Sequence, residues 1–135
     1  MRYNNDQALR TPIINKAIAL NRKLLYVGRR MPNGRKRSKA REAKELPMPN
    51  DIRHQYFDDV LKKGNILFIQ AFRQLKGRDY AKRALETIEE IQASCYLVQS
   101  LGGMSDITCA EIDVLCQEIA SQIYAIQEAQ KSQHH

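Results

Sequence analysis

The sequence predicts an all-α protein that folds as an antiparallel up-down-up-down four-helix bundle with a long basic first connection. Four segments repeat their apolar residues at intervals of three and four, and no segment alternates in the manner of a strand. Two of the three connections are very short, which makes successive helices antiparallel neighbours. The 135 residues, 43% of them hydrophobic, correspond to one globular domain spanning residues 1–135.

The first helix is expected over residues 12–31. Thr11 suits the N-cap, and Pro12 takes the first helical position, where its missing N–H costs nothing. The apolar seam of this helix has heptad-like spacing and consists of Ile13, Ala17, Leu20, Leu24, Val27 and Met31. A helix with such a face must pack on other helices.

The second helix is expected over residues 51–76, with Asn50 or Asp51 as its cap. One apolar stripe comprises Tyr56, Val60, Leu67, Ala71 and Leu75, and a neighbouring stripe comprises Phe57, Leu61, Phe68 and Phe72. Gly64 falls in the first stripe, although glycine there costs about 1 kcal/mol relative to alanine. We interpret it as a point of close helix–helix approach rather than as part of a ligand site.

The third helix is expected over residues 79–101, with Asp79 as cap and Gly102-Gly103 as its end. The fourth is expected over residues 106–129, capped by Ser105, although Thr108 to Glu111 also fits a capping box. Residues 130–135 are expected to form a frayed tail.

The remaining segment, residues 32–49, is basic and nearly devoid of apolar side chains between positions 33 and 45. It cannot bury itself and is expected to be a surface loop. A short solvated or partner-induced helix over residues 38–46 is a further possibility that its composition allows.

The residues that carry chemistry in enzymes are sparse. His54 is the one histidine outside the tail, and no phosphate-binding glycine loop, HExxH, CxxC or nucleophile elbow occurs. The three cysteines, Cys95, Cys109 and Cys116, are predicted to be buried free thiols, which fits a reducing cytoplasm. We therefore expect no enzyme, no catalytic residue, no metal site and no cofactor. No apolar run is long enough to span a bilayer, so no membrane contact is expected.

The charges are unevenly distributed along the chain. The net charge of +7 combines 21 basic and 7 acidic residues at positions 1–83 with one lysine and 8 acidic residues at positions 84–135. Clustered positive charge attracts polyanions at long range. The alternative is that the two halves neutralise each other within the fold or between subunits.

Lysine and arginine at this density contact phosphates without reading bases, and few aromatic residues lie among them to stack on bases. A structured RNA or an RNA/DNA hybrid, bound through its phosphate backbone, fits better than a single strand. The candidate nucleic-acid-binding residues are Arg22, Lys23, Arg29, Arg30, Arg35, Lys36, Arg37, Lys39, Arg41, Lys44, Lys62, Lys63, Arg73, Lys76, Arg78, Lys82 and Arg83.

Three stretches carry a family resemblance: residues 80–91 (YAKRALETIEEI), residues 101–105 (LGGMS) and residues 119–126. Together they resemble a bacterial four-helix-bundle family that contains the ribosomal-RNA intervening-sequence proteins and the accessory variability determinant (Avd) of diversity-generating retroelements. The opening TPIINKA at residues 11–17, the closing RMP at residues 30–32 and the basic character are more similar to the Avd branch.

This resemblance implies a homopentamer with a positive surface that binds the retroelement reverse transcriptase and its template RNA and supports mutagenic reverse transcription. It implies no catalytic residue in this subunit. The functional expectation is therefore a non-catalytic, basic, oligomeric nucleic-acid-binding accessory protein. The alternative is a protein-only oligomeric scaffold of the same bundle family, whose basic face docks an acidic protein partner.

Overall fold

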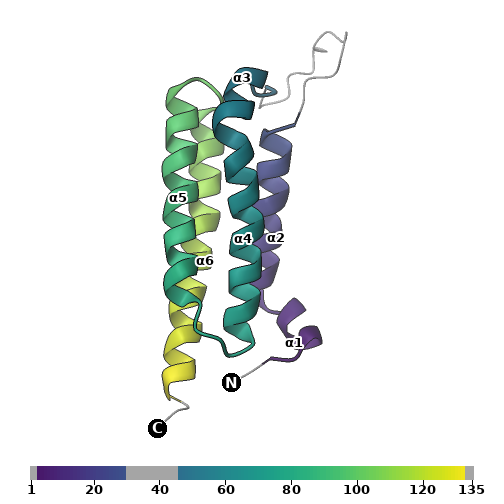
Figure 1. The fold of residues 1–135 in the computed structure, drawn as a ribbon, viewed down its shortest axis with the longest axis vertical. Helices are drawn as coiled ribbons and strands as arrows, with labels where there is room; N and C mark the ends of the chain where they lie inside the picture. The colour runs from purple at the N-terminus through teal and green to yellow at the C-terminus, as the bar shows by residue number, and fades with distance from the viewer. Residues whose placement is uncertain (1–2, 30–45, 133–135) are drawn as a thin grey trace.

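The computed structural model describes residues 3–29 and 46–132, and everything described is α-helical or connecting backbone (Figure 1). The expectation of an all-α fold is confirmed: four long helices pack antiparallel as a helical bundle. The helical segments are α1 (Asn5–Leu9), α2 (Pro12–Val27), α3 (Asn50–Ile52), the π-helix η1 (Arg53–Phe57), α4 (Asp58–Leu75), α5 (Ala81–Ser100) and α6 (Asp106–Ser132).

The four long helices are arranged so that each has two close neighbours. Both α2 and α5 pack against α4 and α6, while α4 and α6 meet more weakly across the bundle. The turn between α4 and α5 lies at the same end as the start of α2 and both termini (Figure 1). The turn between α5 and α6 lies at the opposite end, beside α3.

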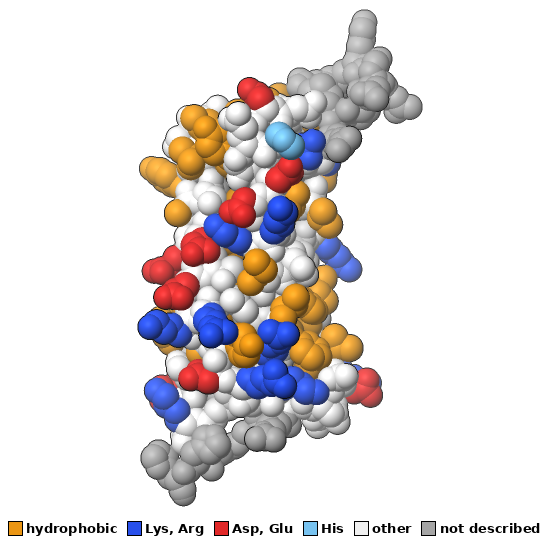
Figure 2. All heavy atoms as spheres, viewed as in Figure 1, with side chains coloured by type: hydrophobic (Ala, Val, Ile, Leu, Met, Phe, Trp, Pro, Cys, Tyr) orange, Lys and Arg blue, Asp and Glu red, His pale blue; other side chains and the backbone are white. Residues whose placement is uncertain are grey.

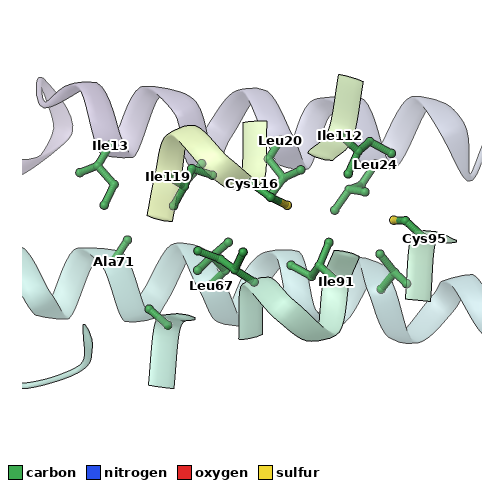
Figure 3. Close-up of a cluster of buried hydrophobic side chains, with 14 of the residues drawn as sticks. Ile13, Leu20, Leu24, Leu67, Ala71, Ile91, Cys95, Ile112, Cys116 and Ile119 are labelled. Carbon is green, nitrogen blue, oxygen red and sulfur yellow. The ribbon is translucent and has the colours of Figure 1, made fainter. Parts of the chain in front are cut away.

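The core runs along the bundle axis and is filled by the apolar stripes that the sequence predicts. Leu20 of α2, Leu67 of α4, Ile91 of α5 and Ile119 of α6 are fully buried and point toward one another (Figure 3). Burying side chains of this size contributes about 1.5–3 kcal/mol each, and that contribution holds the amphipathic helices together.

Several predicted helix ends are confirmed. Thr11 accepts a hydrogen bond from the Ile14 backbone, with Pro12 at the first position, and Ser105 accepts one from Thr108 at the start of α6. Gly77 and Gly102 have positive φ angles of 91° and 84°. After the first glycine, the Arg78 N–H donates to the Arg73 carbonyl, and after the second, the Gly103 N–H donates to the Val98 carbonyl. Both helix ends are therefore Schellman motifs.

The first helix ends earlier than predicted, at Val27 rather than at residue 31. Gly28 lies at its C-cap against the ring of Phe57, and a Cβ there would come within 2.9 Å of that ring. Arg30 and Met31 lie outside the described residues, as does most of the predicted basic loop. The described end of that loop departs from the expectation, because Met48 is buried in the core.

The second long helix contains a π-helical turn, η1, that the sequence pattern did not predict. The extra residue in this turn rotates everything on its N-terminal side relative to α4. As a result Phe57 is fully buried whereas Tyr56 is 40% exposed, so the predicted stripe membership of these two residues was wrong. No side chain caps α3, in contrast to the caps expected at Asn50 or Asp51.

Three further boundaries need correction. The helix α5 begins at Ala81, with Tyr80 rather than Asp79 at the cap position. The helix α6 continues to Ser132, so Gln130 belongs to a helix and not to a frayed tail. The short α1 was not predicted, although Asn4 and Gln7 form a capping box at its start.

Gly64 lies at a close approach of α4 to α2, as the sequence suggested. Its carbonyl accepts a hydrogen bond from the Asn21 side chain, which also donates to the Ala17 carbonyl. A Cβ on Gly64 would lie 2.7 Å from Asn21 Oδ1 and 3.0 Å from Leu24 Cδ1.

We expect Gly64→Ala to lower the free energy of unfolding by up to about 2 kcal/mol, because an overpacking cost of about 1–3 kcal/mol outweighs the gain of about 1 kcal/mol in helix propensity. Urea denaturation would measure it. Asn65→Ala, at the exposed neighbouring position, is the control and should be neutral or slightly stabilising. If Gly64→Ala stabilised the protein, the close approach would not constrain this position.

Candidate nucleic-acid interface

The described candidate cations gather most densely around the turn between α4 and α5. We call this group the basic turn; it comprises Arg73, Lys76, Arg78, Lys82 and Arg83. Figure 2 shows blue side chains collected over the lower ends of α4 and α5, whereas acidic and basic side chains alternate toward the other end. Asp79 is the one acidic residue between positions 73 and 83.

A buried glutamine fixes the backbone of this turn. Gln74 is 2% exposed, and its Oε1 accepts a hydrogen bond of 2.7 Å from the Tyr80 N–H at the start of α5. Its Nε2 donates to Gln130 Oε1 at 2.6 Å, and Gln130 Nε2 donates to the Gln74 carbonyl at 2.8 Å. The ends of α4 and α6 and the start of α5 are thereby joined into one rigid platform.

Three cations of the basic turn, Arg73, Lys76 and Arg83, make contacts that do not neutralise their charge. The guanidinium groups of Arg73 and Arg83 each lie 5.4 Å from the centre of the Tyr80 ring, and Arg73 donates to the Tyr80 hydroxyl. Lys76 donates to the Asn5 side chain at 2.7 Å. Among the described residues, no carboxylate lies within 4.0 Å of a charged nitrogen of the basic turn.

Helix electrostatics do not account for all of these positions. Arg73 lies in the last turn of α4, where a cation is favoured by the helix dipole. Lys82 and Arg83 lie in the first turn of α5, where the dipole disfavours cations, and that turn holds no acidic residue. The arrangement therefore concentrates positive potential at the turn, and this potential suits an anionic ligand.

Other candidate cations are already paired within the fold. Lys23 lies 2.5 Å from Glu111 of α6, and Lys63 lies 2.8 Å from Asp59 and 3.5 Å from Glu90. The hydrogen bond that Lys63 donates to the Asp59 carboxylate is the main cause that raises the pKa of Lys63. These two lysines are less suited to phosphate than the basic turn, and they show that part of the charge is neutralised internally.

The remaining candidates are dispersed. Arg22 of α2 and Lys62, near the start of α4, are exposed. Arg29 follows α2, with its guanidinium 3.8 Å from the centre of the Tyr26 ring. This puts Arg29 at the end of the bundle opposite the basic turn. Outside the described residues lie Arg30, Arg35, Lys36, Arg37, Lys39, Arg41 and Lys44.

The cysteines behave mainly as the sequence predicts. Cys95 and Cys116 are buried, but Cys109 is half-buried, which corrects the expectation that all three would be enclosed. Burial raises the pKa of Cys95 above the usual range and that of Cys116 to about 12, and it also raises the pKa of Cys109. Because thiolates are the reactive form, all three thiols are suppressed as nucleophiles.

We expect iodoacetamide at pH 8 to modify Cys109 first, and Cys95 and Cys116 only when the protein unfolds. Mass spectrometry with and without denaturant would measure this. The raised folded-state pKa values stabilise the fold below the ordinary thiol pKa of 9.0, and this contribution is lost as the pH rises further. Equal labelling of the three thiols in the native protein would contradict this assignment.

Sequence reasoning named the cations of the basic turn but missed Gln74 and Gln130, which organise it. Gln74 lies three residues after Ala71, on the buried face of α4. A polar residue on an apolar face indicates a buried hydrogen bond, and this is the one signal in the sequence that could have revealed its role. Gln130 was assigned to the tail, so its partner could not be inferred.

In comparisons with known proteins, no family model, curated protein or solved structure matches this chain. Within residues 3–29 and 46–132, no group of three or more His, Cys, Asp or Glu side chains is placed to hold a metal ion. The helices of the same ranges include none that is both long and apolar enough to cross a membrane.

Proposed function

We propose that this protein is a non-catalytic nucleic-acid-binding accessory subunit that holds RNA or an RNA/DNA hybrid by its phosphate backbone. The observation that supports this most directly is the basic turn, where five cations without a described carboxylate partner lie around a turn that the hydrogen bonds of Gln74 fix. Arginine guanidinium groups lie over the rings of Tyr26 and Tyr80. Because these ring faces are already occupied, contact with the phosphate backbone is favoured over base stacking.

The resemblance to the Avd branch extends this proposal. It assigns the protein to a retroelement ribonucleoprotein in the cytoplasm, in which a homopentamer of up-down-up-down bundles with a long basic first connection assists a reverse transcriptase in mutagenic reverse transcription. The test is genetic and biochemical: a reverse-transcriptase gene should flank this reading frame, and its product should co-purify with the protein. A frame that stands alone among unrelated genes would contradict this assignment.

The basic segment outside the described residues is tested by replacing Arg35, Lys36, Arg37, Lys39 and Arg41 with alanine. Each lost phosphate contact should flatten the dependence of log K on log salt concentration, reducing the magnitude of the slope by about 0.7–0.9. Fluorescence anisotropy with a labelled RNA hairpin and with the matching hybrid would measure the slope. An unchanged slope would remove this segment from the interface.

The alternative function is a protein-only oligomeric scaffold whose basic face docks an acidic protein. The ion pairs Lys16–Glu118 and Lys23–Glu111 favour it, because they show basic side chains of this chain pairing with carboxylates of another helix. This alternative predicts oligomers free of nucleic acid, and RNA binding that vanishes near physiological salt. Size-exclusion chromatography with absorbance at 260 and 280 nm would distinguish the two functions.

A further inference from the structure

The outer surface between α5 and α6 contains a groove that shares only Lys82, at one end, with the basic turn. Two cavities of about 400 Å³ and 520 Å³ adjoin there and share Gln92. They extend along α5 from Lys82 to Gln99, a distance of about 26 Å at 1.5 Å per residue. We call this feature the acidic groove.

The floor of the acidic groove is apolar, and its sides carry exposed tyrosines. Leu85 and Ile88 of α5 and Ile112 of α6 contribute to the floor. Tyr96 and Tyr124 line the two cavities and are 68% and 56% exposed, which is high for residues of this size. Exposed tyrosines beside an apolar floor are typical anchors for a protein partner.

The charges that line the groove are mostly negative: Glu86, Glu89, Asp106 and Asp113, with Lys82 at one end. Asp106 and Asp113 accept hydrogen bonds from Gln99 and Gln92, which hold these carboxylates across the groove. In the described part of the chain, no Lys or Arg forms an ion pair with any of the four. Four carboxylates that no described Lys or Arg neutralises repel phosphate, so the groove does not suit nucleic acid.

On the opposite flank of α6, an apolar surface flanked by carboxylates is covered by a basic amphipathic helix, α2. There α2, an amphipathic helix with basic residues beside its apolar seam, packs against α6, and Lys16 and Lys23 pair with Glu118 and Glu111. The acidic groove repeats this combination of apolar floor and flanking carboxylates, but no described helix covers it. The ion pairs between α2 and α6 match basic side chains to carboxylates on one flank of α6. On the other flank, the carboxylates of the acidic groove have no basic helix of the described residues beside them.

We propose that the acidic groove binds a basic amphipathic helix of a partner protein. A helix of about 17 residues matches the length of the groove. Its apolar stripe would lie on the floor between Tyr96 and Tyr124, and its Lys or Arg side chains would face Glu86, Glu89, Asp106 and Asp113. This inference concerns another class of ligand than the nucleic-acid proposal, and the two surfaces meet only at Lys82, which belongs to the basic turn and lines one end of the groove.

The test uses the full chain and a dye-labelled synthetic peptide of about 17 residues, with leucines at helical spacing and lysines and arginines beside them. A peptide of identical composition, permuted so that the leucines no longer form one stripe, is the control. We expect micromolar binding of the first peptide by fluorescence anisotropy, and binding at least tenfold weaker for the permuted one. Equal affinity for both peptides would overturn the proposal, because it would show charge attraction alone.

Protein variants locate the binding surface. Glu86→Gln with Glu89→Gln, and separately Tyr96→Ala with Tyr124→Ala, should each weaken the peptide at least tenfold. The matched control is Glu111→Gln with Glu128→Gln, which removes the same charge from exposed positions that do not line the groove and should change the affinity less than twofold. Loss of affinity in the control, or none in the groove variants, would overturn the proposal.

Sedimentation velocity distinguishes a partner protein from a second copy of this chain. If the protein self-associates and Tyr96→Ala with Tyr124→Ala abolishes that association, a second copy fills the groove and the proposal fails. RNA binding of the same variants, measured separately, should be unchanged, so a failure here is distinguishable from a failure of the nucleic-acid proposal.

Discussion

When RNA binding is measured, replacing all five residues of the basic turn with glutamine is expected to make the slope of log K against log salt concentration less steep, reducing its magnitude by about 3.5–4.5. Each cation that contacts a phosphate releases counterions worth about 0.7–0.9 of slope, and the turn concentrates five such cations on one rigid platform. At low salt the affinity itself should fall by roughly a thousandfold or more. Fluorescence anisotropy at four or more salt concentrations gives both quantities.

The control for this experiment removes cations that the fold already pairs. Lys16, Lys23 and Lys63 each lie within 3.2 Å of a carboxylate, so changing these three to glutamine should alter the slope little per charge removed. Circular dichroism must show that both variants keep their helices. Equal loss of slope per charge in the two variants would mean that RNA responds to net charge and not to the basic turn.

The fold was largely predictable because its signals are local and repeated. The spacing of Ile13, Ala17, Leu20 and Leu24 defines the buried face of α2 over several turns, and one irregular residue does not obscure it. The turn glycines also act locally, since Gly77 and Gly102 adopt a left-handed conformation that other residues disfavour. These signals specify helices and turns without reference to the rest of the chain.

The features that escaped prediction depend on contacts between distant segments. The hydrogen bonds between Gln74 and Gln130 join residues 56 positions apart, so neither residue is remarkable within its own helix. The same holds for Lys23, whose partner Glu111 lies 88 positions away and turns a candidate phosphate ligand into half of an ion pair. Charge counting along a sequence cannot separate paired from unpaired cations.

The π-helix η1 is the clearest case in which periodicity failed, and it yields a matched test. We expect Phe57→Ala to lower the free energy of unfolding by about 3–5 kcal/mol, because Phe57 is fully buried and its removal leaves a cavity. We expect Tyr56→Ala to cost far less, within about 0.5 kcal/mol of neutral for an exposed side chain that does not fill the core. Urea denaturation of the two variants measures the difference.

The contrast between the two neighbours is the informative quantity. A regular α-helix from residue 51 would place Tyr56 in the stripe with Val60 and Leu67, and Tyr56→Ala would then be a costly core truncation. The π-turn instead brings the ring of Phe57 against Gly28, at the point where α2 ends. A larger loss for Tyr56→Ala than for Phe57→Ala would contradict the burial of Phe57 at this point. The predicted order would confirm that Phe57, rather than Tyr56, fills the core where the second long helix meets the end of α2.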